Sequence, residues 1–284
     1  MIKVGFIDYF LDEWHANNYP KMIHEASNGE VEAVYAYGMI PTPKTGKTTD
    51  EWCAEHGLTK CETIEELVEK SDGIIVLSPD NSEMHYVLSE YALKSGKPVF
   101  IDKTFATGLE MGKQIFDLAA KYDTPVYSTS SLRFAEEYQA IDKSQITAMN
   151  CLGPNGLEIY AIHMLEPMIM LMQKDAERVM FVDGERYYSV VIEFTDGRKG
   201  IISGFMGRNP YVINIAGPER DHFYTAEGNG YFLTFIKELV EYFKDRRIRV
   251  PHEQTLAIMA ILSAAKKSRD NGGEWVKTEE KFLG

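Results

Sequence analysis

The sequence predicts two domains of different class: a doubly wound parallel α/β sheet, followed by an α+β domain with an open antiparallel sheet. Three observations predict this division. Strand and helix patterns alternate up to about residue 128, as in repeated βαβ units. From Tyr187 onward apolar residues recur at every second position, with a turn signal at Asp196-Gly197. A chain of 284 residues is also long enough for two hydrophobic cores.

The first predicted domain spans residues 1–128. Its strands read as apolar runs, and continuous runs are expected where both faces of a parallel sheet are covered. Because proline is disfavoured inside a helix, Pro20 predicts a first helix that begins near Tyr19, with Asn18 as its cap and a long loop before it. The predicted strands are Ile2–Asp8, Val31–Tyr37, Asp72–Ser78, Pro98–Ile101 and Pro125–Ser128.

The second predicted domain spans residues 129–284. An apolar helical pattern covers Leu157–Gln173, and later helices are predicted at Phe232–Phe243 and Glu253–Ser268. Alternation predicts an antiparallel sheet, because one face of each strand is apolar and the other polar. Its predicted strands are 145–152, 187–195, 200–206, 211–216 and 222–225.

Composition excludes several classes of protein. A formal net charge of −13 would repel a phosphate backbone, so nucleic acid is not an expected partner. No apolar run approaches the roughly 18 residues that a membrane span needs. The amino terminus begins with a strand pattern rather than a signal peptide, and Cys53, Cys61 and Cys151 suit reduced thiols. We therefore expect a cytoplasmic location.

Lys103 is the leading candidate for chemistry. The apolar run Pro98–Ile101 ends abruptly in Asp102-Lys103. In an open parallel sheet the carboxyl ends of the strands face the ligand crevice, so a lysine at this position points toward a bound ligand. The alternative is a solvated lysine that opens a loop.

The residues around Lys103 resemble a known family. Gly96-Lys97-Pro98, followed by Asp102-Lys103-Thr104, resembles the "GK-V-EKP-A" segment of the Gfo/Idh/MocA family, named for glucose-fructose oxidoreductase and inositol dehydrogenase. In that family the lysine lies beside the nicotinamide and the reacting hydroxyl. Here aspartate replaces glutamate and threonine replaces proline. Ser78–His85 stands where the family has "TP-x-x-x-H", with two extra residues.

The resemblance covers essentially the whole chain and implies a Rossmann-type first domain. It implies an oxidoreductase that uses NAD or NADP on a sugar, polyol or related hydroxyl compound. In this family a second subunit covers the open sheet, which implies a homodimer or homotetramer.

A second catalytic candidate lies in the helix pattern Leu157–Gln173. Tyr160 and His163 stand three residues apart, and the family's catalytic helix has the form "D-x-x-x-H", with histidine as the general base. The aspartate position holds Ile159, so Glu158 or Tyr160 would substitute for it. The alternative is a hydrogen-bonded core histidine.

The loop after the first strand departs from the usual dinucleotide fingerprint. It keeps Gly5 and then reads Asp8-Tyr9-Phe10-Leu11-Asp12-Glu13, which adds negative charge where a diphosphate would lie. Tyr37 replaces the acidic residue that binds ribose, and it either stacks on adenine or simply ends the strand. The candidates for cofactor contact are Asp8, Tyr9, Tyr37, Ser78, Asn81, Asp102 and Lys103.

Three functions remain open. The first is an NAD(P)-dependent oxidoreductase, in which Lys103, His163 and Tyr160 form the catalytic set. The second is a relative that binds or senses a sugar-like ligand with little or no cofactor, and the third is a hydrolase or lyase that retains NAD. The lost glycines favour the second function, whereas Lys103 and His163 favour the other two. A zinc site is not expected, because the seven histidines lack ligand spacing.

Overall fold

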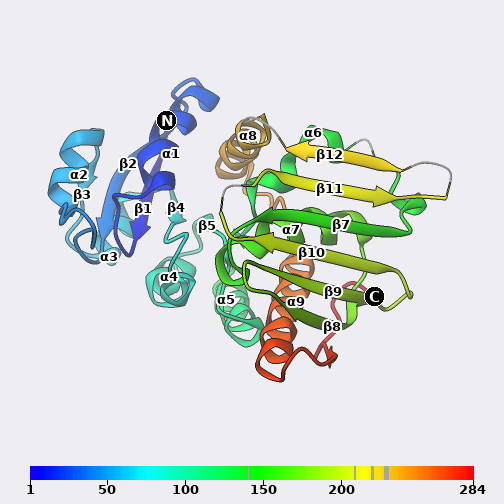
Figure 1. Cartoon of the computed structure of the whole chain (residues 1–284). Helices are drawn as coiled ribbons and strands as arrows, with labels where there is room; N and C mark the ends of the chain where they lie inside the picture. The colour runs from blue at the N-terminus through cyan, green and yellow to red at the C-terminus, as the bar shows by residue number, and fades with distance from the viewer. Residues whose placement is uncertain (140, 208, 219–220, 227–229) are drawn as a thin grey trace. The chain divides into compact units, whose positions relative to one another are not determined.

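The computed structural model describes residues 1–139, 141–207, 209–218, 221–226 and 230–284 (Figure 1). The chain forms two compact units. The first unit comprises Met1–Ser128 and Leu233–Pro251, and the second comprises Thr129–Phe232 and His252–Gly284. Residues 233–251, which the sequence analysis assigns to the second domain, therefore pack with the first unit.

The first unit contains a six-stranded sheet in the order β3-β2-β1-β4-β5-β6. All of its strand pairs are parallel, and β4 and β5 are buried along their whole length. This order is that of a Rossmann fold, so the predicted parallel sheet is confirmed. The strands are β1 (Ile2–Asp8), β2 (Val31–Gly38), β3 (Thr59–Lys60), β4 (Gly73–Val76), β5 (Val99–Ile101) and β6 (Val126–Tyr127).

Helices connect these strands, as the alternating pattern predicts. Several begin with a residue that caps the first turn, and Thr48 and Glu51 form a reciprocal capping box at α2. The helices of this part of the chain are α1 (Trp14–Ser27), α2 (Thr49–His56), α3 (Ile64–Lys70), the short 3₁₀ turn η1 (Ser82–Met84), α4 (His85–Leu93) and α5 (Leu109–Lys121).

Helix α1 begins earlier than the sequence predicts. The expected start near Tyr19 with Asn18 as cap is wrong, because Glu13 caps the helix and Pro20 lies inside it. Proline costs one backbone hydrogen bond at that point. The helix nevertheless buries Ala16, Tyr19, Ile23 and Ser27, which lie on one face. The loop between β1 and α1 is consequently short.

Helix α8 (Gly230–Asp245) brings a late segment of the chain to the first sheet. The Tyr242 hydroxyl donates to the carbonyl oxygen of Pro125 at 2.7 Å and accepts from the Val99 amide at 3.0 Å. Phe235 packs against Phe100, with ring centroids 5.6 Å apart. These contacts explain why residues 233–251 belong to the first unit.

The second unit contains a seven-stranded sheet in the order β12-β11-β7-β10-β9-β8-β13. The sheet is mixed rather than wholly antiparallel, because β10 lies parallel to β7 while the other pairs are antiparallel. The predicted antiparallel sheet is corrected in this one respect. Its strands are β7 (Ala148–Pro154), β8 (Ala176–Asp183), β9 (Tyr187–Phe194), β10 (Lys199–Phe205), β11 (Tyr211–Ala216), β12 (His222–Ala226) and β13 (Val276–Lys277).

Two long helices, α7 (Leu157–Met172) and α9 (His252–Asp270), cover one face of this sheet (Figure 1). The buried residues of β9 and β10, such as Val190, Ile192 and Ile202, alternate with half-exposed residues such as Val191 and Ile201. One face of the sheet therefore forms the core of the unit. Three short segments precede β7, namely η2 (Ser131–Phe134), α6 (Glu136–Gln139) and η3 (Lys143–Gln145).

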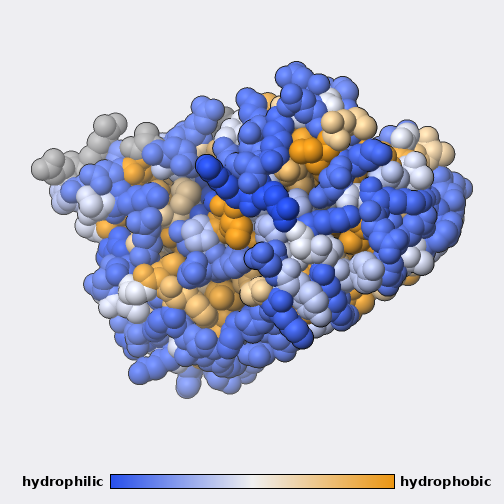
Figure 2. Space-filling view, turned by 180° about the vertical axis from the view of Figure 1, so that it is seen from behind, coloured by the Kyte–Doolittle hydropathy of each residue, from blue (hydrophilic) through white to orange (hydrophobic). Residues whose placement is uncertain are grey.

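Hydrophilic residues cover most of the surface seen in Figure 2, with hydrophobic patches between them. Each helix within the described part of the chain is too short or too polar to span a lipid bilayer. The three cysteines Cys53, Cys61 and Cys151 are buried free thiols.

Candidate functional site

The carboxyl ends of β1 and β4 bring together three of the predicted residues. Asp8 is the last residue of β1, and its Oδ1 accepts a hydrogen bond from the Ser78 hydroxyl at 2.8 Å. The same hydroxyl accepts from the Tyr9 amide at 2.9 Å. Asp8 and Ser78 are buried, and Asp8 Oδ2 has no hydrogen-bond partner among the described residues. Buried polar atoms without a partner are costly and uncommon in folded proteins.

Asp102, directly after β5, forms a buried ion pair with His15 of α1 through Asp102 Oδ2 and His15 Nδ1. Burial alone would raise the pKa of Asp102, but His15 and Lys103 outweigh burial and lower it. Burial alone would lower the pKa of His15, but Asp102 and Glu13 outweigh it and raise it. The pair is therefore held in its charged form. His15 is a site residue that the sequence analysis did not propose.

Two carboxyl groups beside this pair have raised pKa values. Burial raises the pKa of Asp8 to about 8, against the opposing effect of the Ser78 hydroxyl. Protein atoms around the half-buried Glu13 remove water from its carboxyl and raise its pKa to about 8, and the charge of Asp8 adds to the rise. Displaced pKa values of this kind are enriched at functional sites.

Lys103 is buried, so it is not the solvated lysine of the alternative interpretation. Its Nζ donates to the carbonyl oxygen of Pro79 at 2.9 Å and lies 3.9 Å from the Asp80 carboxylate. Its amide donates to Asp102 Oδ1 at 2.7 Å. The ammonium group is thus positioned by the segment after β4, at the carboxyl ends of the strands.

The remaining candidates of the first unit are Asn81, whose amide donates to the Ser78 carbonyl oxygen at 3.0 Å, and Tyr37. Asn81 precedes η1 and donates from Nδ2 to Glu83 at 2.9 Å. Tyr37 lines a cavity of about 280 Å³ formed by residues 37–41, 48–50 and 60–62, after β2 and β3. Lys60 at this cavity pairs with Asp50 at 2.8 Å. The predicted contacts of Tyr37 and Asn81 with a cofactor stay predictions.

In the second unit, α7 positions His163. From Ala161 to Met170, His163 is the one residue that is not buried. Its Nδ1 lies 2.6 Å from the Ser130 hydroxyl. The rings of Tyr160 and Tyr211 meet it edge to face, with centroid separations of 5.7 and 5.5 Å. His163 is therefore a positioned, accessible histidine rather than a core residue.

The hydrogen-bond partner of His163 is neither Glu158 nor Tyr160, the two residues that the sequence analysis expects in place of the family's aspartate. Glu158 is exposed and pairs with Arg269 of α9. Tyr160 touches the histidine ring through its aromatic edge. Ser130, which lies 33 positions before His163, supplies the hydrogen bond. Sequence spacing carried no signal for this partner.

One turn beyond His163, Glu166 is buried in an ion pair with Arg133 Nε. Glu166 also accepts from the Thr129 hydroxyl at 3.1 Å, and Arg133 Nη1 donates to Gln254 at 2.6 Å. In the part of the chain that the structure describes, Arg133 Nη2 has no hydrogen-bond partner. These contacts join η2, α7 and α9 beneath His163.

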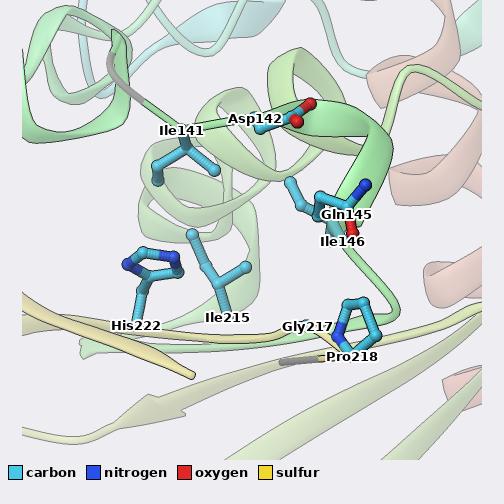
Figure 3. Close-up of a pocket in the computed structure, with 8 residues that line it drawn as sticks. All are labelled: Ile141, Asp142, Gln145, Ile146, Ile215, Gly217, Pro218 and His222. Carbon is cyan, nitrogen blue, oxygen red and sulfur yellow. The ribbon is translucent and has the colours of Figure 1, made fainter. Parts of the chain in front are cut away.

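A separate cavity of about 200 Å³ lies in the second unit beside β11 and β12 (Figure 3). Ile215 and His222 face it from the strands, and Ile141, Asp142 and Gln145 face it from the segment before β7. None of the predicted site residues lines this cavity. Within the described ranges, no three His, Cys, Asp or Glu side chains are grouped so that they could hold a metal ion.

Part of the chain is similar to a known family. Residues 11–130 match the sequence model of the Gfo/Idh/MocA family, described as an oxidoreductase family with an NAD-binding Rossmann fold. The match includes Lys103 and the carboxyl ends of β4 and β5. It agrees with the resemblance that the sequence motifs indicate, over a part of the chain that lies almost wholly in the first unit. No curated protein sequence matches the chain.

Solved structures share the fold over the whole chain at low identity. Scyllo-inositol dehydrogenase from Lactobacillus casei with bound NAD(H) and scyllo-inositol is 15% identical, with a TM-score of 0.82 and coverage of 99% of this chain and 100% of the other. Myo-inositol 2-dehydrogenase from Lactobacillus plantarum is 12% identical, with a TM-score of 0.81 and coverage of 98% and 99%. GenD2 from gentamicin A biosynthesis, in complex with NAD, is 14% identical, with a TM-score of 0.79 and coverage of 98% and 97%.

The residues at the amino end of α1 do not fit a dinucleotide diphosphate as they are arranged. In a Rossmann fold, backbone amides at this end bind the diphosphate. Here the amides of His15 and Ala16 already donate to the Glu13 carboxyl. A phosphate at these amides would have to displace that carboxyl.

Proposed function

We propose that this protein is an NAD- or NADP-dependent oxidoreductase that acts on a hydroxyl group of a sugar, polyol or related compound. The observation that carries the proposal is the burial of Lys103 at the carboxyl end of β5, inside the segment that matches an NAD-binding oxidoreductase family. The fold shared with inositol dehydrogenases supports a polyol-like substrate.

The chain supplies two groups that such a reaction needs. Oxidation of an alcohol requires a base for the hydroxyl proton and a cation that stabilises the negative oxygen. His163 takes the proton: when its Nδ1 donates to the Ser130 hydroxyl, Nε2 is the basic nitrogen. Lys103 supplies the cation, and Tyr160 borders the histidine ring. Asp8, Tyr9, Ser78 and Asp102 remain the candidates for cofactor contact.

The half-exposed face of the second sheet supports a further part of this proposal. Val191, Ile201 and Leu152 place apolar surface on the face opposite α7 and α9. A homodimer or homotetramer would cover this face. Light scattering on the purified protein tests the assembly, and fractionation of cells tests the cytoplasmic location that we expect.

Titration calorimetry with NAD, NADH, NADP and NADPH tests the cofactor, followed by activity assays on a panel of polyols and sugars. We expect heat of binding with one cofactor pair and oxidation of at least one hydroxyl compound. No heat and no thermal stabilisation at millimolar cofactor would contradict the proposal.

A second candidate function is a relative that binds a sugar-like ligand without turnover of a cofactor. The specific observation in its favour is the Glu13 carboxyl on the amides of His15 and Ala16. Binding of a polyol in calorimetry, combined with no binding of any cofactor form, would select this function.

A further inference from the structure

The amino end of α1 holds a carboxyl group that belongs to the chain itself. Glu13 Oε2 accepts from the His15 amide at 2.8 Å, and Oε1 accepts from the Ala16 amide. The first amides of a helix have no partner within the helix, and the helix dipole attracts anions to them. Glu13 satisfies two of these amides at the position where other Rossmann folds bind a phosphate.

The loop that carries Glu13 is fixed at both of its ends. The Tyr9 amide donates to the Ser78 hydroxyl at 2.9 Å. Asp12 accepts from Asn17 Nδ2 at 3.1 Å, and its own amide donates to the Thr42 hydroxyl at 3.3 Å. Such contacts hold the Glu13 carboxyl over the helix end rather than leaving it to solvent.

Acidic groups surround the same position. Asp12 lies beside Glu13 in sequence, and the Asn17 amide lowers the pKa of Asp12, so Asp12 is ionised at neutral pH. Asp8 is buried, and its Oδ2 has no hydrogen-bond partner within the described ranges. A diphosphate placed here would meet the ionised carboxylate of Asp12, which repels it.

We propose that Glu13 is an internal occupant of the anion position at the amino end of α1, and that it weakens dinucleotide binding by keeping the diphosphate away from the amides of His15 and Ala16. This inference deepens the proposed function, because it concerns the cofactor of that reaction. The Glu13 side chain has to leave the helix end before a diphosphate reaches it. The free energy needed to move Glu13 away consequently lowers the affinity that direct contacts with the dinucleotide would give.

Replacement of Glu13 by serine tests the inference. Serine is a preferred helix cap and carries no charge, so Glu13→Ser keeps α1 capped while it frees the anion position. Titration calorimetry would compare the wild type with this variant, using NADH, NADPH, ADP and inorganic diphosphate as probes. We expect the dissociation constants of the variant for NADH or NADPH, and for ADP, to fall by about 10-fold or more.

Two matched variants control for charge and for stability. Glu25→Ser removes an exposed carboxylate from the same helix and should leave each dissociation constant within about 2-fold of the wild type. Glu13→Asp keeps an acidic cap and should remain a weak binder. If Glu13→Ser fails to fold, Glu13→Asn replaces it, since asparagine also caps helices well.

Unchanged or weaker binding of ADP and of the dinucleotides by the folded serine or asparagine variant would overturn the inference. A gain of about 10-fold in Glu25→Ser as well would also overturn it, because the effect would then come from net charge. If Glu13→Ser gains affinity but no hydroxyl compound is oxidised, the inference stands and the proposed oxidoreductase function fails. If the wild type oxidises a polyol and Glu13→Ser shows no gain, the function stands and the inference fails.

Discussion

Asp8 and Glu13 of the first unit differ in their surroundings from Glu166 of the second unit, although the first unit also contains the paired residues Asp102 and His15. Beside the parallel sheet, Asp8 and Glu13 have raised pKa values, and the described contacts give Asp8 Oδ2 no partner. Beneath α7, by contrast, Glu166 is paired with Arg133 and also accepts from Thr129. Burying a charge is costly unless it is paired and hydrogen-bonded.

This difference separates two roles for buried polar groups. A balanced pair such as Arg133–Glu166 fixes the position of elements around it, and here it supports the helix that presents His163. Unbalanced carboxyl groups destabilise the fold above the pH at which they ionise, so they are typical of sites that bind or react. Four sets of variants test this contrast, and they follow in order of expected effect.

The largest effect is expected on breaking the balanced pair. Arg133→Met leaves Glu166 as an unpaired buried charge and should destabilise the protein by about 3–5 kcal/mol, measured by urea unfolding. Arg269→Met, which breaks the surface pair with Glu158, should cost about 0–1 kcal/mol. The double variant Arg133→Met with Glu166→Met should recover part of the loss. If Arg133→Met and Arg269→Met destabilise the protein equally, the proposed role of the buried Arg133–Glu166 pair is wrong.

The next effect concerns turnover. Lys103→Ala and His163→Ala should each lower kcat by about 100-fold or more with the fold intact, because each removes an interaction that is strongest in the transition state. The double variant should lose less than the product of the two. The exposed residues Lys21 and His24 provide matched alanine controls that should leave kcat unchanged.

A purely structural histidine would behave differently. His163→Ala would then lower the Tm and leave the activity of the folded fraction nearly unchanged. Circular dichroism alongside kinetics separates the two outcomes.

A smaller effect is expected at Ser130, which acts through His163. Ser130→Ala removes the hydrogen bond to Nδ1 and should lower kcat by about 10-fold, with a change in the pH dependence of kcat. Ser130→Thr should restore part of the activity because it keeps the hydroxyl. The exposed Ser144 supplies the alanine control. An unaltered pH profile in Ser130→Ala would show that the hydroxyl does not position the base.

The smallest effect is expected at Asp8 and depends on pH. The pKa of Asp8 is about 8 in the folded protein and has its ordinary value of 3.8 in the unfolded chain. The folded state therefore holds a proton that the unfolded state releases, and stability is lost as pH rises from about 4 through 8. Asp8→Asn cannot ionise and should be more stable than the wild type by about 1 kcal/mol or more at pH 9.

Thermal melts from pH 5 to 9 would measure this difference. Asp117→Asn, at an exposed position on α5, should follow the wild-type curve. An Asp8→Asn curve parallel to the wild type over the whole range would show that Asp8 is not held protonated.

Much of the fold could be predicted because its signals are local. Apolar runs identified β4 and β5, and period-two alternation identified β9 and β10. The parallel pairing of β10 with β7 could not be predicted in this way, since it depends on which distant strand becomes the neighbour. The start of α1 differs from the prediction. Pro20 is a strong local signal against a helix interior, but the Glu13 cap and the buried face of the helix outweigh the cost of this proline.

The site was predicted less completely, for a related reason. Lys103 and His163 carry family motifs, and their positions at a strand end and on a helix follow from local patterns. Their partners come from elsewhere in the chain: His15 reaches Asp102 from 87 positions away, and Ser130 reaches His163 from 33 positions away. Side-chain partners at such separations leave no periodic trace in a single sequence.

The return of α8 to the first sheet has a consequence for synthesis of the chain on the ribosome. Tyr242 joins the backbones of β5 and of the segment before β6, and Phe235 covers Phe100. When the ribosome has completed Ser128, neither residue yet exists, and the amino ends of β5 and β6 at Val99 and Pro125 remain exposed to water. The first unit therefore matures only after the intervening residues of the second unit have emerged. A nascent chain arrested at Ser128 should accordingly be sensitive to protease at β5 and β6, and one released after Pro251 should be resistant there.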